Sequence, residues 1–155
     1  MMNIEVTAMR RPIILVSFLL VAVVASPGCE SNTSNLAAPT DTTFDLADLA
    51  EVLFATGVPV DVGNEEVVSF FPVPVRHFTV FDDDVLVLEF VGPNTATAVA
   101  STISSDGTTI NGQVIDWPAT PHFFQEGRII VLYLGDDPQV IFALEQILGP
   151  QFAGG

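Results

Sequence analysis

A continuous apolar run, Ile129–Leu134, constrains the fold of this chain more than any other segment. Neighbouring residues of a strand face opposite sides of a sheet, so a strand that is apolar at every position needs cover on both faces. Such cover is found in the interior of a sheet. We therefore predict that residues 128–134 form a central strand, which follows a tight turn at residues 125–127.

The other elements follow from periodicity and from turn residues. Apolar residues at helical spacing predict a helix from Phe44 to about residue 55, capped within residues 41–43 and ended by Gly57. A last helix is predicted after the cap Asp137, and Gly149 ends it. The remaining predictions are strands at 66–71, 75–81 and 85–91, a hairpin tip at 82–84, a weaker helix at 95–103, a short strand at 110–117 and an edge strand at 122–124.

The predicted order is α-β-β-β-α-β-β-β-α. Short connections between strands favour a mainly antiparallel sheet. We expect the three helices to pack on one face, which gives an α+β fold of the two-layer sandwich type.

The first 28 residues have the features of an export signal. Arg10 and Arg11 form a basic start, and an apolar run broken only by Ser17 follows from 13 to 25. This run of about 13 residues is shorter than the roughly 20 that a membrane-spanning helix needs, so it fits a cleaved signal. Cys29, the only cysteine, comes directly afterwards and leaves the chain without an intramolecular disulfide.

The segment around Cys29 resembles the lipobox of bacterial lipoproteins, in which the cysteine becomes the acylated first residue. Gly28 matches that motif, whereas Ser26 and Pro27 depart from its commoner Leu-Ala or Leu-Ser pattern. The resemblance implies a signal peptide (1–28) and export to the cell membrane or outer membrane, where Cys29 anchors the protein through its lipid. A secretory signal cut after Ala25 and a twin-arginine signal remain alternatives.

Residues 29–40 are polar and predict a flexible tether, and residues 41–155 are long enough for a single domain with its own core. The stretches 117, 121–124, 127–133, 135–136 and 148–154 resemble short bacterial secreted or lipoprotein-type domains of uncharacterised function. This resemblance covers roughly residues 44 to 154. It implies a domain that occurs behind export signals, and it implies no activity or ligand.

The chain is strongly acidic, with 19 Asp and Glu against four Lys and Arg and a formal net charge of −15. Loss of the leader removes Glu5, Arg10 and Arg11, which leaves 18 acids, two arginines and a net charge of −16. So few cations argue against binding to nucleic acid phosphates or to anionic headgroups. The acidity fits a solvated surface, and the alternatives are a saline habitat, a cationic partner or weak calcium binding by Asp82–Asp84 with Asp136 and Asp137.

No motif predicts a catalytic, cofactor or metal site. The sequence contains no Gly-x-Ser-x-Gly elbow and no glycine-rich phosphate loop, and its one thiol is assigned to the anchor. A small secreted hydrolase or a metal-dependent enzyme stays an alternative function, and it would require His77, His122 and nearby acids to meet in one cleft.

A second sheet face left open by the helices would expose apolar side chains. Monomers rarely leave such a patch uncovered, so it would bind a protein partner, a second copy or an apolar ligand. The predicted binding residues are Phe70, Phe71, His77, His122, Phe123 and Phe124. The alternative is that one helix or the irregular segment 106–121 crosses over and covers this face. With the patch open, the sequence favours a lipid-anchored, non-catalytic interaction module of the cell envelope.

Overall fold

The predicted central strand lies in the interior of the sheet. In the computed structural model, which describes residues 43–155, β7 (Ile129–Leu134) is fourth in a six-stranded sheet of order β1-β2-β3-β7-β6-β8. Every residue of β7 but the last is buried. The predicted signal peptide, Cys29 and the tether 29–40 lie outside the described residues.

All pairings in the sheet are antiparallel, which confirms the predicted α+β class with a mainly antiparallel sheet. The other strands of the sheet are β1 (Val60–Glu66), β2 (Val75–Val80), β3 (Asp83–Glu89), β6 (Pro121–Glu126) and β8 (Ala153–Gly154). A separate two-stranded hairpin joins β4 (Thr109–Ile110) to β5 (Gln113–Val114). The three helices are α1 (Leu46–Ala55), α2 (Pro93–Ala100) and α3 (Pro138–Leu148).

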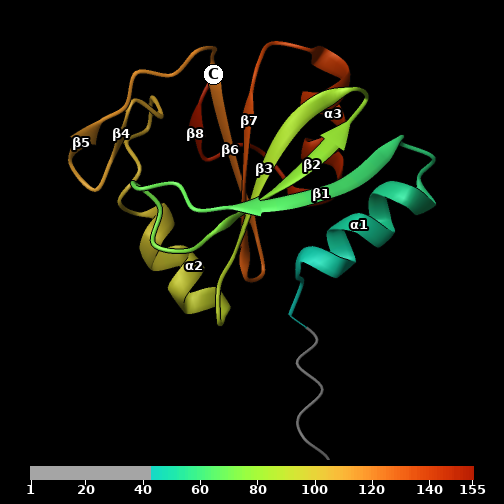
Figure 1. Ribbon diagram of the computed structural model, residues 1–155, viewed down its shortest axis with the longest axis horizontal. Helices are drawn as coiled ribbons and strands as arrows, with labels where there is room; N and C mark the ends of the chain where they lie inside the picture. The colour runs from blue at the N-terminus through green and yellow to red at the C-terminus, as the bar shows by residue number, and fades with distance from the viewer. Residues whose placement is uncertain (1–42) are drawn as a thin grey trace, which may run out of the picture. The chain divides into compact units, whose positions relative to one another are not determined.

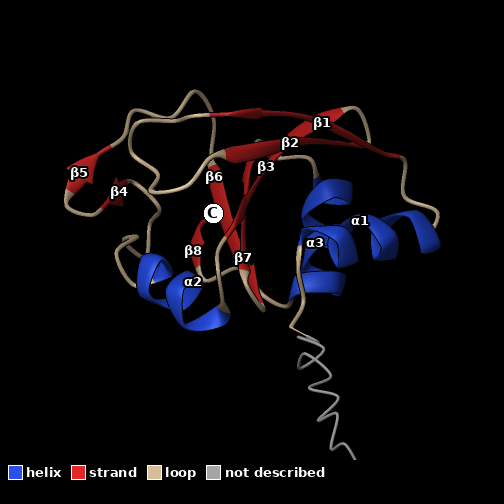
Figure 2. Ribbon diagram, turned by 60° about the horizontal axis from the view of Figure 1, so that its bottom comes forward, coloured by secondary structure: helices blue, strands red, loops and turns tan. Residues whose placement is uncertain are grey.

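The helices cover both faces of the sheet, so the expected packing on one face is wrong. Buried residues of α1 and α3 share a core with Phe78, Val87 and Val131, and we call this side the first face. Ala96 and Ala100 of α2 belong to the opposite core, on the second face. Figures 1 and 2 show α2 on the other side of β6 and β7 from α1 and α3.

The strand predicted at 66–71 is also wrong, because β1 ends where that strand was expected to begin. Residues 67–74 instead form an irregular loop, in which the Phe71 amide donates to the Val68 carbonyl (3.1 Å). Phe70 and Phe71 from this loop pack into the core of the second face. In the sequence, the apolar residues of a loop that covers a sheet therefore look the same as the apolar residues of a strand.

Two further strands differ from the sequence prediction. The segment 121–126 is not an edge strand, because β8 pairs with it through His122↔Gly154 and Phe123↔Ala153. The strand expected at 110–117 is the β4–β5 hairpin, whose turn residues Asn111 and Gly112 have φ of 50° and 76°. Asn-Gly is the preferred sequence for such a two-residue turn.

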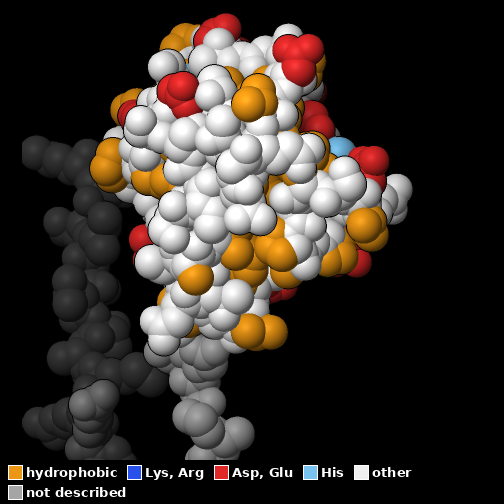
Figure 3. Space-filling view, turned by 90° about the vertical axis from the view of Figure 1, so that its left-hand side faces the viewer, with side chains coloured by type: hydrophobic (Ala, Val, Ile, Leu, Met, Phe, Trp, Pro, Cys, Tyr) orange, Lys and Arg blue, Asp and Glu red, His pale blue; other side chains and the backbone are white. Residues whose placement is uncertain are grey.

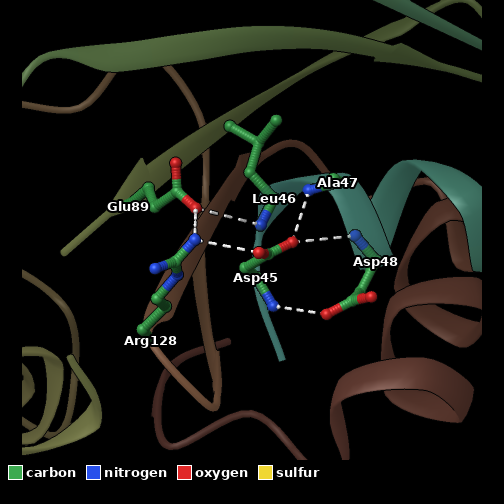
Figure 4. A network of polar contacts seen from close by, with 6 residues as sticks. All are labelled: Asp45, Leu46, Ala47, Asp48, Glu89 and Arg128. Carbon is green, nitrogen blue, oxygen red and sulfur yellow. Dashed lines mark hydrogen bonds and ion pairs between the residues drawn. The ribbon is translucent and has the colours of Figure 1, made fainter. Parts of the chain in front are cut away.

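The first helix begins later than predicted, and a network of polar contacts fixes its start (Figure 4). Asp45 is the N-cap: its side chain accepts from the amides of Ala47 (2.8 Å) and Asp48 (3.0 Å), and Asp48 caps Asp45 in return. The second Asp45 oxygen accepts from Arg128 Nη2 (2.9 Å), which also lies 3.0 Å from Glu89. The entry of the chain into the domain is thereby joined to β3 and to the β6–β7 hairpin.

Candidate functional site

The two histidines lie on opposite faces of the sheet. His77 pairs with Leu86 in the β2–β3 ladder, one position from Phe78 and therefore on the second face. His122 pairs with Tyr133 in the β6–β7 ladder, on the first face. Because β3 and β7 also separate their strands, His77 and His122 do not meet in one cleft. The arrangement required for the hydrolase or metalloenzyme alternative does not form.

His77 is held between two carboxylates from neighbouring strands. Its Nδ1 lies 2.9 Å from Asp84 Oδ1, and its Nε2 lies 3.2 Å from Glu66 Oε2. The hydrogen bond to Asp84 raises the pKa of His77 above its usual value, against a smaller opposing effect of burial. Both ring nitrogens are occupied, so this histidine has no free nitrogen to offer a substrate or a metal ion.

His122 is buried and anchors the end of the chain. Its Nδ1 lies 2.6 Å from Gln151 Oε1, and the Gln151 amide in turn donates to the Gly154 carbonyl (3.0 Å). Its Nε2 has no hydrogen-bond partner and is 4.0 Å from Asp136 Oδ1. These contacts hold β8 against β6, which is a structural role.

Three of the five aspartates considered for calcium have separate roles. Asp83 accepts from the Tyr133 hydroxyl (2.7 Å), Asp84 contacts His77, and Asp137 caps α3 at the Gln139 amide (2.7 Å). Within residues 43–155, no three His, Cys, Asp or Glu side chains are arranged to hold a metal ion.

The aromatic residues predicted to bind a partner are mostly core residues. Phe123 and Phe124 have no exposed surface, Phe71 is buried and Phe70 is half-buried. Phe70 packs edge-on against Trp117, with ring centroids 5.4 Å apart. The expected open second face is therefore wrong. The alternative, that one helix or the irregular segment 106–121 crosses over and covers this face, is confirmed by α2, Ile110 and Trp117 in that core. A pocket of about 340 Å³ lies beside Phe70 and Phe71.

An apolar groove with a volume of about 480 Å³ lies on the side of α3. One wall is the outer side of α3, and the other comes from the end of α1, the α1–β1 connection and the β2–β3 turn. Its lining contains no charged side chain and consists of Thr56, Val58, Phe81, Gln139, Phe142, Ala143, Gln146 and Ile147. We refer to this set as the α3 groove.

Exposed aromatic side chains mark the α3 groove and its surroundings. Phe142 in the lining is 63% exposed, and Phe54, two residues before Thr56, is 79% exposed. Both lie outside the apolar stripes that α1 and α3 bury, and this is the signal that sequence analysis could have used. An aromatic residue on the solvent side of an otherwise amphipathic helix indicates a contact beyond the domain's own core.

Phe81 occupies an unusual backbone position in the groove wall. It and Asp82 form the two-residue turn between β2 and β3, with φ of 51° and 71°. Glycine or asparagine is preferred in such a turn, and a bulky residue there costs about 1–2 kcal/mol. The ring of Phe81 packs against the core of the first face and remains partly exposed towards the groove.

The charges around the α3 groove are negative. Asp82 adjoins Phe81, Asp137 caps α3 at Gln139, and Glu145 adjoins Gln146. The two arginines of the described residues are both in ion pairs, Arg76 with Glu65 (2.8 Å) and Arg128 with Asp45. The side of β4 and β5 also shows Asp and Glu and no Lys or Arg, with hydrophobic side chains in separate groups (Figure 3).

Comparison of the chain with protein families, curated proteins and solved structures finds no match. In residues 43–155, the helices are too short or too polar to span a bilayer.

Proposed function

We propose that this chain is a lipid-anchored protein of the bacterial cell envelope and that its domain is a non-catalytic interaction module. Residues 1–28 direct export, acylated Cys29 holds the protein at the cell membrane or outer membrane, and residues 29–40 act as the tether. The proposed anchor is supported by the lipobox-like segment and the short apolar run before it.

The proposed interaction role depends on one observation, the uncharged α3 groove in a chain of net charge −15. An apolar depression of several hundred Å³ has the dimensions of known binding sites. An aromatic side chain such as Phe142, exposed beside it, loses contact with water when a partner binds, and this supplies binding energy. The α3 groove thus replaces the second sheet face as the proposed contact surface.

Mass spectrometry of the protein purified from its native membrane tests the anchor. We expect a mature chain that starts at Cys29 and carries fatty acyl groups. An unacylated chain that starts at Ser26 would show instead that the secretory alternative is correct.

Photo-crosslinking in the native cell tests the groove. A photoreactive phenylalanine analogue replaces Phe142 in one variant and Val91, which is 90% exposed and outside the groove, in a matched control. We expect a discrete adduct from position 142 and none from position 91. Equal labelling at both positions, or none at either, would refute the interaction role of the groove.

A further inference from the structure

We propose that the α3 groove binds an amphipathic helix of a partner protein, with apolar residues on one side of that helix and Lys or Arg at its ends. This inference rests on the proposed interaction role and adds the chemistry of the partner. It is carried by the shape of the α3 wall, by the lining and by the surrounding charge.

The wall of the groove on α3 is itself a helical stripe. Gln139, Phe142, Ala143 and Gln146 have the spacing i, i+3, i+4 and i+7, so they lie along one side of α3, which meets the buried stripe at Ala143. Side chains at this spacing form the ridges and grooves by which two helices pack. Ala143 is small and buried, so it forms the floor of the groove, while Phe142 beside it is 63% exposed.

The opposite wall completes a trough rather than a closed cavity. Thr56, Val58 and Phe81 face the stripe across the opening. An incoming helix presents apolar side chains at i, i+3, i+4 and i+7, which is the usual way in which a helix occupies such a groove. The glutamines at both ends of the stripe can hydrogen-bond to polar side chains that flank the apolar side of that helix.

Charge selects among the occupants that an apolar groove could take. No cation lines the groove, and both arginines of the described residues are engaged elsewhere, so a fatty acid carboxylate or an anionic headgroup would lack a counter-charge. A second copy would bring the same acidic surface into contact with this one. A partner with basic residues next to its apolar side matches Asp82, Asp137 and Glu145 around the groove.

The test measures binding of synthetic peptides to the mature protein, which is purified from cells that express the full-length sequence. If the purified protein carries an acyl chain, it is placed in phosphatidylcholine nanodiscs. The first peptide is a 16-residue helix former with Leu and Phe at helical spacing and Lys at both ends. The second has the same composition in an order that breaks the spacing, and the third has Glu in place of Lys. Binding is measured by fluorescence anisotropy, with empty nanodiscs as background.

We expect the first peptide to bind and the other two to bind at least about tenfold more weakly. Phe142→Ser should weaken the first peptide by about 30-fold, the loss typical of a central aromatic contact. Val91→Ser removes a similarly exposed apolar side chain outside the groove and should change binding by less than twofold. Circular dichroism of both variants checks that the fold is retained.

Each of the following results would overturn the inference. Equal binding of the first two peptides, or no effect of Phe142→Ser, would mean general attraction of lysines to an acidic surface. Tighter binding of the Glu peptide would reverse the proposed charge preference. A dimer in sedimentation that Phe142→Ser dissociates would identify a second copy as the occupant. If crosslinking from position 142 succeeds while no peptide binds, the interaction role stands and only this choice of partner fails.

Discussion

The Asp45 side chain takes part in two stabilising interactions, a helix cap and an ion pair. The substitutions Asp45→Ala and Asp45→Asn can separate their contributions to stability. Its side chain caps α1 through two backbone amides, and the same carboxylate pairs with Arg128 (Figure 4). Loss of an N-cap costs about 1 kcal/mol. The ion pair is only about a quarter exposed at each side chain, 28% at Arg128 and 27% at Asp45, and we assign it about 1 kcal/mol at low salt.

Asp45→Ala removes both interactions, so we expect a loss of about 2 kcal/mol, which corresponds to roughly 8 °C in melting temperature for a domain of this size. Asp45→Asn keeps the cap, because asparagine caps as well as aspartate, and loses only the charge. Its expected cost is about 1 kcal/mol in low salt and less in 1 M salt, where screening weakens the pair. The difference between the two variants should not depend on salt.

Urea unfolding followed by circular dichroism, in low and high salt, measures these free energies. Removal of any carboxylate also lowers the self-repulsion of an acidic protein, so Asp116→Asn serves as the charge control. Asp116 is exposed and has no polar partner among residues 43–155. Equal losses for Asp45→Ala and Asp45→Asn would refute the prediction, because they would show that the cap contributes nothing to the free energy of unfolding.

Three other predictions follow from single residues. The pKa of His77 is raised, so its contacts stabilise the fold below its unfolded pKa, and this contribution is lost as pH rises through the higher folded value. His77→Gln should therefore reduce the difference in unfolding free energy between pH 5.5 and pH 8.5, by no more than about 1 kcal/mol because the site is partly exposed. A steeper dependence of the unfolding free energy on pH in this variant would contradict the prediction. Gly127→Ala should lower the free energy of unfolding in urea by more than about 2 kcal/mol, since a Cβ there would overlap the Phe44 carbonyl and the residue has φ of 51°. Gly112→Ala is the matched control: Gly112 has φ of 76° but lies in open space, so this variant should cost about half as much. Burial and the hydrogen bond to Asp83 raise the pKa of Tyr133 to about 12. Because Tyr133 is the only tyrosine, absorbance at 295 nm after a rapid pH jump measures its ionisation directly. A titration midpoint near 10 in the folded protein would show that Tyr133 is neither buried nor bonded to Asp83 as described.

The elements with strong local signals could be predicted from the sequence. The apolar run of β7 required cover on both faces, and Asp137, Pro138 and Gly149 fixed the ends of α3. These signals are local, because each depends on the backbone geometry or burial of a few adjacent residues. The turn at Asn111-Gly112 was equally local and could have been predicted as a hairpin.

The layer order could not be predicted in the same way. Ala96 and Ala100 carry no information on which face of the sheet α2 covers, since that depends on how the chain crosses the edge of the sheet. The acidic strand β1 has a weaker apolar pattern than the loop after it, so the pattern predicts a strand in the loop. β8 is short and glycine-containing, and it becomes a strand because β6 offers it a free edge.

The α3 groove is a tertiary feature, and its parts are far apart in the sequence. Thr56, Phe81 and Phe142 come from separate elements, and none belongs to a motif. What the sequence does contain is Phe54 and Phe142 on the solvent side of their helices. The sequence prediction of an exposed apolar surface names Phe71, Phe123 and Phe124, and the structure buries all three in the core.

The two edges of the sheet differ from those that invite strand addition. β1 carries a bulge, where Gly63 and Asn64 lie opposite His77, and it presents Asp61, Glu65 and Glu66, while β8 has only two residues. Bulges, charges and short strands all disfavour edge-to-edge pairing between molecules. The proposed acyl anchor would concentrate the protein in two dimensions and bring its copies together often, and such edges would then keep neighbouring copies from joining into fibrils.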